Sequence, residues 1–374
     1  MVRFAREKKS CFTTIIEIKM KKILYILCLA GFIVSCKKDP QLIDKEKYVY
    51  DIPPVRLSTN AIVGTYYFNY SSSDWNKVHS DTSLVVPAGG KSYNAVTDAT
   101  VFPKQLAWAD EAGVDYMIFK WNASATDNSL LNAFATRRTT QNVKMVIGYN
   151  TAHLSATNAS PLTGAKLQTM ITEFKSLITQ HISKEYYYNI AGRPVILITP
   201  LNLSSSALTS IDYKVVMEAL RAELKTIGVN PFFIGELATG WTAPANFSAD
   251  ALASMDAIVV SNWNTADFDR WWAFYSFVDL NWQNWKASLD KLNVEFVPCI
   301  FPGYNEPSAA TQRIIDRTEK NYVDYANVAK RNMGVNQMVI INSWNDFSKG
   351  TALEPSKKYN KQFLELTKRE FKVN

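Results

Sequence analysis

Histidine and cysteine are scarce in this chain of 374 residues, and their scarcity argues against two kinds of site. The three histidines do not have the spacing of metal ligands; they are His79, His153 and His181. Three of the four cysteines precede residue 37, so Cys299 is left without a disulfide partner in the rest of the chain. We therefore expect no metal, no disulfide and no cofactor.

The chain also lacks a strong charge of one sign once its first residues are set aside. It carries 41 Lys and Arg against 34 Asp and Glu, a net charge of +7. Residues 1–35 hold seven of these bases and two of these acids, so the remainder is near +2. There is no basic stripe with interleaved aromatic residues, and we expect no nucleic-acid partner.

The N-terminal segment has the pattern of a bacterial export signal. A start at Met20 gives two lysines and then an apolar run over residues 23–34, which is too short to cross a bilayer. The run ends in Ile33-Val34-Ser35-Cys36, which resembles the lipobox of bacterial lipoproteins. That resemblance implies a lipid on Cys36 and a place at the bacterial outer membrane, on the cell surface or on the periplasmic face. An ordinary signal peptide with a chance cysteine is the alternative.

These features divide the chain into three parts. We expect residues 1–35 to be a signal peptide that truly starts at Met20, and residues 36–54 to be a lipidated polar tether. Residues 55–374 are expected to form one domain, because no linker or change of composition divides them.

Eight short apolar runs recur along residues 55–374, and each leads into polar or aromatic residues and then into a stretch with helical spacing. The runs are nearly continuous in apolar residues, as expected for strands buried on both faces of a parallel sheet. Eight such units predict an α/β fold, a single (β/α)8 TIM barrel. The alternative is an open doubly wound sheet, but no glycine-rich phosphate loop follows the first run. The runs cover residues 61–68, 114–120, 143–149, 194–199, 232–237, 257–261, 296–301 and 337–341.

Polar and aromatic residues gather where the predicted strands end. In a barrel these ends meet at one mouth, which is where active sites lie. Trp lies beside Asn after the second, sixth and eighth strands, and aromatic rings with amides and few cations suit a carbohydrate. The stacking role requires that the indoles face the mouth, and core packing is the alternative for each of them. The predicted sugar-binding residues are Tyr67, Trp121, Asn122, Trp263, Tyr304, Trp344 and Asn345.

Five stretches resemble glycoside hydrolase family 99 and its relatives among bacterial lipoproteins that degrade polysaccharides. They are Gly64–Asn69, Gly113–Trp121, Tyr188–Pro194, Phe301–Glu306 and Ser343–Pro355, and the last, SWNDFSKGTALEP, is the most specific. The resemblance implies a retaining endo-acting α-mannosidase with a barrel fold and no metal. It also implies two carboxylates in the loop after the eighth strand. The first deprotonates the sugar's own 2-hydroxyl, and the second protonates the leaving oxygen.

Two positions depart from that pattern. Asp346 matches the first carboxylate but is one methylene shorter than the family's glutamate, a difference of about 1.5 Å. Lys349 stands where the second carboxylate belongs, and an ammonium is a poor substitute for a carboxylic proton donor. Hydrolysis would then need another carboxyl.

Glu306 and Glu236 are the candidate proton donors, from the ends of the seventh and fifth strands. A carboxyl separation from Asp346 of about 5–5.5 Å would fit double displacement, and one of about 6.5–9.5 Å would fit inversion. The alternatives are that Glu306 is a solvated loop acid and that Glu236 is the buried partner of a Lys or Arg.

Three functions stay open at this point. The first is a glycoside hydrolase that acts without metal on a polysaccharide or glycan, α-mannan-like by the resemblance. The second is a catalytically impaired glycan-binding protein that lacks the proton donor. The third is a scaffold lipoprotein whose mouth is filled by its own side chains. The expected partners are a carbohydrate, the membrane through Cys36 and proteins of polysaccharide utilisation.

Overall fold

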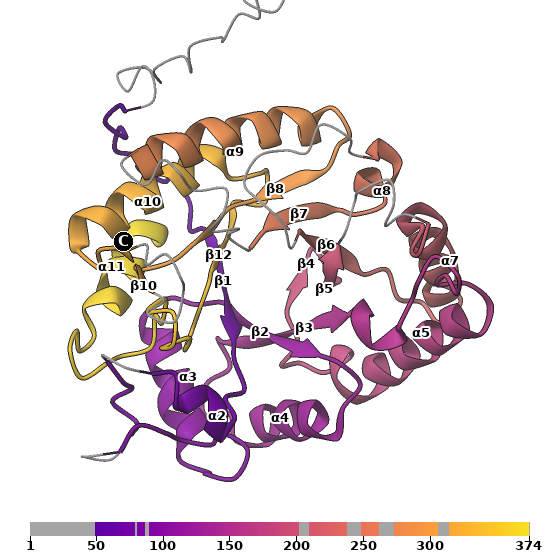
Figure 1. The fold of residues 1–374 in the computed structure, drawn as a ribbon, viewed down its shortest axis with the longest axis horizontal. Helices are drawn as coiled ribbons and strands as arrows, with labels where there is room; N and C mark the ends of the chain where they lie inside the picture. The colour runs from indigo at the N-terminus through magenta and orange to yellow at the C-terminus, as the bar shows by residue number, and fades with distance from the viewer. Residues whose placement is uncertain are drawn as a thin grey trace, which may run out of the picture. The chain divides into compact units, whose positions relative to one another are not determined.

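The computed structural model describes residues 49–78, 81–86, 90–201, 209–237, 248–261, 273–305 and 314–373. One compact unit runs from Tyr50 to Asn374, and its strands form a ring inside a layer of helices (Figure 1). The Tyr50 hydroxyl donates to Asp279 Oδ2 at 2.7 Å, and the Val55 amide donates to Asn327 Oδ1 at 3.0 Å. The folded unit therefore begins within the last residues of the expected tether.

Among the described residues, nine parallel strands occupy the eight positions of a (β/α)8 barrel in the order β8-β7-β6-β5-β3-β2-β1-β12-β9. β8 and β9 are the two halves of one strand, interrupted at Pro298. β8 pairs with β7 and β9 pairs with β12, so together they close the ring. The predicted fold is confirmed. The strands are β1 (Ile62–Tyr67), β2 (Tyr116–Trp121), β3 (Lys144–Asn150), β5 (Arg193–Leu201), β6 (Phe232–Leu237), β7 (Ala257–Val260), β8 (Glu295–Val297), β9 (Cys299–Ile300) and β12 (Met338–Ile341).

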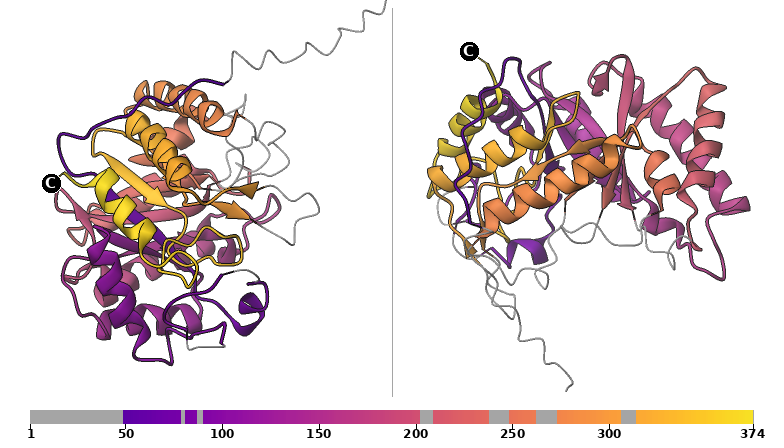
Figure 2. Two further views of the ribbon diagram at one scale, coloured as in Figure 1. Left: turned by 90° about the vertical axis from the view of Figure 1, so that its left-hand side faces the viewer. Right: turned by 90° about the horizontal axis from the view of Figure 1, so that it is seen from above.

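Helices follow the strands and cover the outside of the ring, and α10 lies between α9 and α11 (Figure 2). None of the described helices is both long and apolar enough to cross a membrane. The helices are α2 (Ser72–Trp75), α3 (Val101–Glu111), α4 (Ala125–Thr136), α5 (Gly164–Leu177), α7 (Tyr213–Lys225), α8 (Ala249–Ala253), α9 (Phe274–Asp290), α10 (Glu319–Asn332) and α11 (Gln362–Phe371). Shorter elements are the 3-10 turn η2 (Thr151–Leu154), the π-turn η3 (Ile178–Ile182), β4 (Asn189–Ile190), β10 (Tyr304–Asn305) and β11 (Ile314–Ile315).

Helix α7 shows how the sequence specifies these elements. Its buried residues recur every three or four positions, from Val216 through Leu220 to Leu224, so one face packs on the barrel. The Asp212 side chain caps its first turn by accepting from the Val215 amide. The turn that ends the helix places Gly228 at φ +74°, a conformation that glycine adopts without strain.

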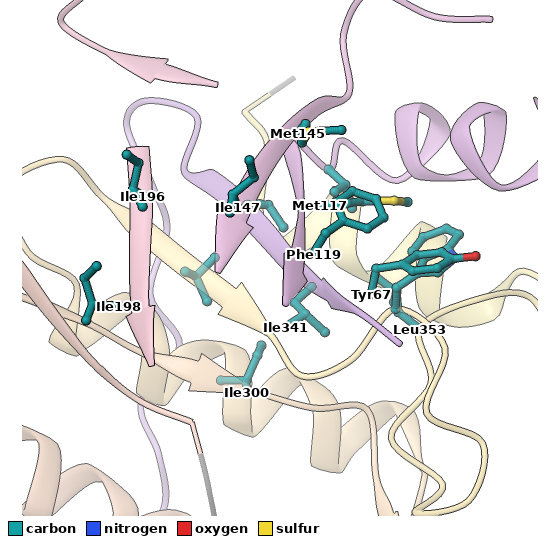
Figure 3. Close-up of a cluster of buried hydrophobic side chains, with 14 of the residues drawn as sticks. Tyr67, Met117, Phe119, Met145, Ile147, Ile196, Ile198, Ile300, Ile341 and Leu353 are labelled. Atoms are coloured by element: carbon teal, nitrogen blue, oxygen red, sulfur yellow. The ribbon is translucent and has the colours of Figure 1, made fainter. Parts of the chain in front are cut away.

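Two apolar clusters alternate along the strands. One takes residues from every barrel strand and none from a helix, so it fills the barrel interior. The other includes the helix residues and the alternate strand residues, and Figure 3 labels ten members of this cluster. On β2, for example, Ile118 belongs to the interior and Phe119 to the helix-facing layer. This alternation decides which residues at the strand ends can reach the mouth.

At the amino-terminal end of the strands, the barrel interior is filled by a large side chain. Tyr116, the first residue of β2, is fully buried there. A Cβ at Gly64 would lie 2.2 Å from the Tyr116 ring, so only glycine leaves it room. Because the interior is packed at this level, a ligand can reach the strands only from their carboxyl ends.

Candidate active site at the carboxyl ends of the strands

The loop after β12 carries a carboxylate whose two oxygens have different surroundings. Asp346 is 6 % exposed, and its Oδ1 accepts from the hydroxyls of Tyr70 (2.5 Å) and Ser348 (2.6 Å). The amides of Ser348 (3.1 Å) and Lys349 (3.2 Å) donate to the same oxygen. No described residue donates a hydrogen bond to Oδ2. The protein therefore anchors one oxygen and leaves the other for a ligand.

Tyr70 stays a hydrogen-bond donor in this arrangement. Burial, and then the charge of Asp346, raise the pKa of the Tyr70 phenol well above its ordinary value. The phenol therefore keeps its proton and directs it at Asp346.

Trp344 and Asn345 attach this loop to the segment after β1. The Asn345 side chain accepts from the Phe68 amide at 2.8 Å, and it donates to the Phe68 carbonyl at 2.9 Å and to the Tyr93 hydroxyl at 2.8 Å. The Trp344 amide donates to the Tyr66 carbonyl at 2.7 Å. The carbonyl oxygen and both amide hydrogens of Asn345 are thus used within the protein, which corrects its predicted role in binding sugar hydroxyls.

Glu354, near the end of the same loop, is the centre of a buried hydrogen-bond network. Its carboxyl is fully buried and accepts from the hydroxyls of Ser83 (2.6 Å) and Tyr93 (2.9 Å) and from the Gln105 amide (3.1 Å). Burial raises the pKa of Glu354 to about 7, although these donors oppose the shift. Its backbone amide also donates to the Trp344 carbonyl at 2.7 Å, so Glu354 supports the loop that presents Asp346.

Lys349 contributes its backbone to this loop, and its ammonium has no partner among the described residues. Its carbonyl accepts from the Asn305 amide at 2.8 Å, so the loops after β9 and β12 touch at this point. The ammonium makes no hydrogen bond or ion pair in the described part of the chain.

A second polar group crosses the barrel interior below the mouth. The Lys120 ammonium lies 3.4 Å from Glu236 Oε2 and 3.5 Å from Oε1, although β2 and β6 are separated in the ring by β3 and β5. The Ser261 hydroxyl donates to Glu236 Oε1. The same ammonium lies 5.6 Å from the centre of the Tyr66 ring. The sequence left Glu236 either as a candidate proton donor or as the buried partner of a lysine or arginine. The structure shows it as the buried partner of Lys120.

The structure corrects the stacking role predicted for Trp121 and Trp344. Trp344 is fully buried in the helix-facing layer. Trp121 is 5 % exposed, and its Nε1 donates to Asn128 of α4 at 2.8 Å. Neither indole presents a ring face to the mouth. For Trp121 the cause is the strand alternation, because Lys120 points inward and the next residue must point outward.

Tyr67 is corrected for the same reason. Its hydroxyl donates to Gln105 at 3.0 Å, and its ring packs on Phe102 at 5.4 Å between centroids, in the helix-facing layer. Tyr304 of β10 is 6 % exposed and packs against Phe301, so little of its ring is accessible.

Asn122 is the predicted binding residue that the structure leaves at the surface. It lies just beyond β2 and accepts at 2.5 Å from the side chain of Asn150, the last residue of β3. Glu306, Trp263 and Cys36 lie outside the described residues.

A cavity of about 930 Å³ lies elsewhere, at the amino-terminal side of the barrel. It is lined by α7, by α8 and by the residues that lead into β6, β7 and β8. Function in this fold belongs to the carboxyl ends, so we place the candidate site at Asp346 and not in this cavity. No group of three His, Cys, Asp or Glu residues in the described ranges could hold a metal ion.

The fold is similar to that of solved glycoside hydrolase-like barrels. A solved structure described as a glycoside hydrolase-like protein has a TM-score of 0.74 and 22% identity, and covers 88% of this chain and 99% of its own. The endo-α-mannosidase of family GH99 from Bacteroides thetaiotaomicron, in complex with Bis-Tris propane, has a TM-score of 0.57 and 17% identity, over 84% of this chain and 97% of its own. At these identities the likeness shows the fold alone.

The family assignment comes from the sequence. The family model described as glycosyltransferase WbsX matches residues 164–367, which is more than half of the chain, and the chain belongs to this family. The family is related to family 99, so the resemblance seen in the motifs is confirmed. No curated protein matches the chain.

Lys120, Tyr66, Ser261 and Tyr70 lie in the site although they are not among the predicted binding residues. One signal could have identified Lys120 as the partner of Glu236: two apolar strands each contain a single charge near the end, Lys120 in YMIFKW and Glu236 in FFIGEL, and the two charges have opposite signs. Buried charges are paired, so these two were candidates for a contact across the barrel. Tyr70 carried no comparable signal.

Proposed function

We propose that this protein is a carbohydrate-active enzyme that cleaves a glycan at the barrel mouth without a metal, with Asp346 as its central carboxylate. The observation that carries the proposal is that Asp346 Oδ1 accepts from four donors, while none of the described residues donates to Oδ2. A carboxylate fixed in this way can accept a proton from a sugar hydroxyl through its free oxygen. The glycoside hydrolase-like barrel supports the choice of ligand.

Cleavage also needs a proton donor, and we propose Glu306 ahead of Glu236. Asn305 directly precedes Glu306, and its amide donates to the carbonyl of Lys349, the residue that replaces the family's acid. A carboxyl carried by this neighbouring loop could supply the missing proton. Glu236 is already engaged by Lys120 and Ser261, which suits a fixed binding residue better than a donor.

The solved relatives suggest which sugar to test first. One of them is an endo-α-mannosidase. We therefore propose an α-mannan-like substrate, with Asn122 at the edge of the mouth as a contact for its hydroxyls.

A second function is favoured by Lys349. Its ammonium replaces a carboxylic acid and has no partner in the described part of the chain. A protein that lost its proton donor at this position would bind the glycan and release no product. The surface role of such a protein would be to retain the polysaccharide for partner enzymes.

We also propose that Cys36 carries a lipid that holds the protein at the bacterial outer membrane. The Ile33-Val34-Ser35-Cys36 sequence supports this proposal. Labelling of cells with a radioactive fatty acid should mark the wild type and leave Cys36→Ser unlabelled. Equal labelling of the two would reject the anchor.

The deciding experiment for the enzyme is a screen of polysaccharides, yeast α-mannan included, that scores both binding and product release. Since the family is described as a glycosyltransferase, each reaction is run with and without an added oligosaccharide acceptor. Asp346→Asn should lower turnover by about 100-fold or more and leave binding within about threefold. Asp110→Asn, which changes a surface carboxylate bonded to Thr140 and Asn142, is the matched control.

The outcomes separate the proposals. Equal activity of Asp346→Asn and the wild type would remove Asp346 from the mechanism. Binding without product on every substrate would favour the glycan-binding function. A wild type that neither binds nor cleaves any member of the panel would reject both carbohydrate functions.

A further inference from the structure

Near the mouth, two buried polar atoms of the barrel interior have no hydrogen-bond partner among the described residues. They are the Tyr66 hydroxyl and Glu236 Oε2, and both residues are only 2 % exposed. The Tyr116 hydroxyl is a third such atom, but it lies at the amino end of β2 and outside this group. The Tyr66 hydroxyl lies beside Ser261 but forms no well-shaped hydrogen bond with it, and Oε2 has only the Lys120 ammonium at 3.4 Å. Leaving such atoms unpaired is costly in a native protein, so each of them calls for a partner from outside the chain, a ligand or a water molecule.

These atoms belong to one group that is reached from the mouth. Lys120, Glu236, Ser261 and Tyr66 come from the ends of β2, β6, β7 and β1. The Lys120 side chain is 40% exposed whereas that of Glu236 is 3% exposed, so the ammonium forms the accessible side of the group. Contacts that come from four strands place the group on the barrel axis and not within a single loop.

The group contains both kinds of hydrogen-bonding partner that a sugar hydroxyl needs. Glu236 Oε2 can only accept. The Lys120 ammonium can only donate. Burial, with the charge of Glu236 adding to it, raises the pKa of the Tyr66 phenol, so the phenol keeps its proton as a further donor.

We propose that Lys120, Glu236 and Tyr66 form a subsite that binds two adjacent hydroxyls of a neutral sugar ring. One hydroxyl donates to Glu236 Oε2, and the neighbouring oxygen accepts from Lys120 or Tyr66. The inference rests on the proposed carbohydrate function. It goes beyond it by assigning Glu236 to binding and by naming the charge class of the sugar.

The neutral class follows from the charges. The Lys120 ammonium already has a carboxylate 3.4 Å away, so little positive charge is left for a second anion. A uronic acid or a sulfate would place its negative charge beside Glu236, and like charges in a buried site repel. A hydroxyl pair satisfies the unpaired atoms without that penalty.

The test uses the full-length protein and NMR titration with three probes: methyl α-D-mannopyranoside, methyl α-D-glucopyranoside and the glucuronide that matches the second. The monodeoxy analogues of the tighter neutral probe are then titrated against the wild type, Glu236→Gln and Tyr66→Phe. Glu223→Gln is the matched control, because Glu223 also pairs with a lysine, Lys175 at 2.8 Å, but on the helical surface.

We expect the neutral glycosides to bind more tightly than the glucuronide, and Glu236→Gln to weaken them by about 10- to 100-fold. Removal of one particular sugar hydroxyl should weaken the wild type by a similar factor and have little further effect on Glu236→Gln. That non-additivity identifies a direct contact, since a variant with a merely disturbed fold would lose affinity for every analogue alike. Glu223→Gln should match the wild type.

Tyr66→Phe gives a second measurement that does not depend on the choice of sugar. Removal of an unpaired buried hydroxyl should leave the thermal midpoint of the free protein unchanged or raise it, whereas a structural hydroxyl would lower it. Unchanged affinity of Glu236→Gln, a uniform loss across the analogues, tighter binding of the glucuronide, or a clear drop in the Tyr66→Phe midpoint would each overturn the subsite. Those results leave the proposed function standing if the wild type still binds and cleaves a glycan. The proposed function fails separately, if the wild type releases no product from any member of the polysaccharide panel.

Discussion

The buried carboxyl of Glu354 should make the stability of this protein fall as the pH rises. In the folded state its pKa is raised from 4.5 to about 7. The folded chain therefore holds this proton more tightly than the unfolded chain does. The resulting stabilisation is fully present below pH 4.5 and is lost as the pH rises through 7.

The magnitude follows from the same two values. One pKa unit corresponds to about 1.4 kcal/mol, so a rise from 4.5 to about 7 amounts to about 3 kcal/mol between acid and neutral solution. Glu354→Gln removes the charge and keeps the shape. It loses part of the bonding to Ser83, Tyr93 and Gln105, which costs about 1 kcal/mol at every pH. The variant should therefore be less stable than the wild type at pH 4.5 and more stable by about 2 kcal/mol at pH 8.

Urea unfolding at several pH values from 4.5 to 8 measures this difference. Glu111→Gln is the control, because Glu111 forms an ion pair with Lys361 at 2.7 Å at the surface, where 43% of its side chain is exposed. Its difference from the wild type should stay small at every pH. A difference between Glu354→Gln and the wild type that does not change with pH would refute the reasoning. It would mean that the hydrogen bonds to Glu354 lower its pKa by as much as its burial raises it.

Three further changes test the loop after β12. Trp344→Ala should lower the free energy of unfolding by about 3–5 kcal/mol, measured by chemical unfolding, because it empties a fully buried site. If Trp344 were an exposed stacking residue, the same change would mainly lower the affinity for a glycan and leave the stability almost unchanged. Tyr70→Phe removes one of the four donors to Asp346 Oδ1 and should lower turnover on any cleaved glycan by about tenfold with little change in unfolding, and an unchanged turnover would count against this contact. Lys349→Glu should raise activity on α-mannosides, measured by product release, and a folded variant that stays inert would argue against a simple loss of the family's acid.

The barrel could be predicted from the sequence because its strands are buried on both faces. Each of the eight apolar runs fell on a strand position of the ring, including the run that Pro298 divides into β8 and β9. The same property hid which residues face the mouth. In a half-buried strand polar residues mark the outer face, but here both faces are apolar, so the pattern does not reveal the direction of Tyr67 or Trp121.

The network around Glu354 could not be predicted for a different reason. Ser83, Tyr93 and Gln105 are about 250 to 270 positions away in the chain, as the separations of 271, 261 and 249 show. None of them has a local pattern that marks it as a partner of a buried acid. Only the closure of the ring between β1 and β12 brings the segment after β1 against the loop after β12.

The motif SWNDFSKGTALEP thus divides into a supporting part and an exposed part. Trp344, Asn345 and Glu354 are fully buried and have their polar contacts within the protein, apart from the Trp344 indole nitrogen, which has no partner among the described residues. Asp346 and Lys349 lie between them, and each keeps a charged group without a partner in the described part of the chain, the Oδ2 oxygen and the ammonium. A sequence match to the supporting residues therefore reports how the loop is held. In the proposed function the chemistry depends on positions 346 and 349, so a match to the supporting residues does not distinguish a protein that cleaves a glycan from one that only binds it.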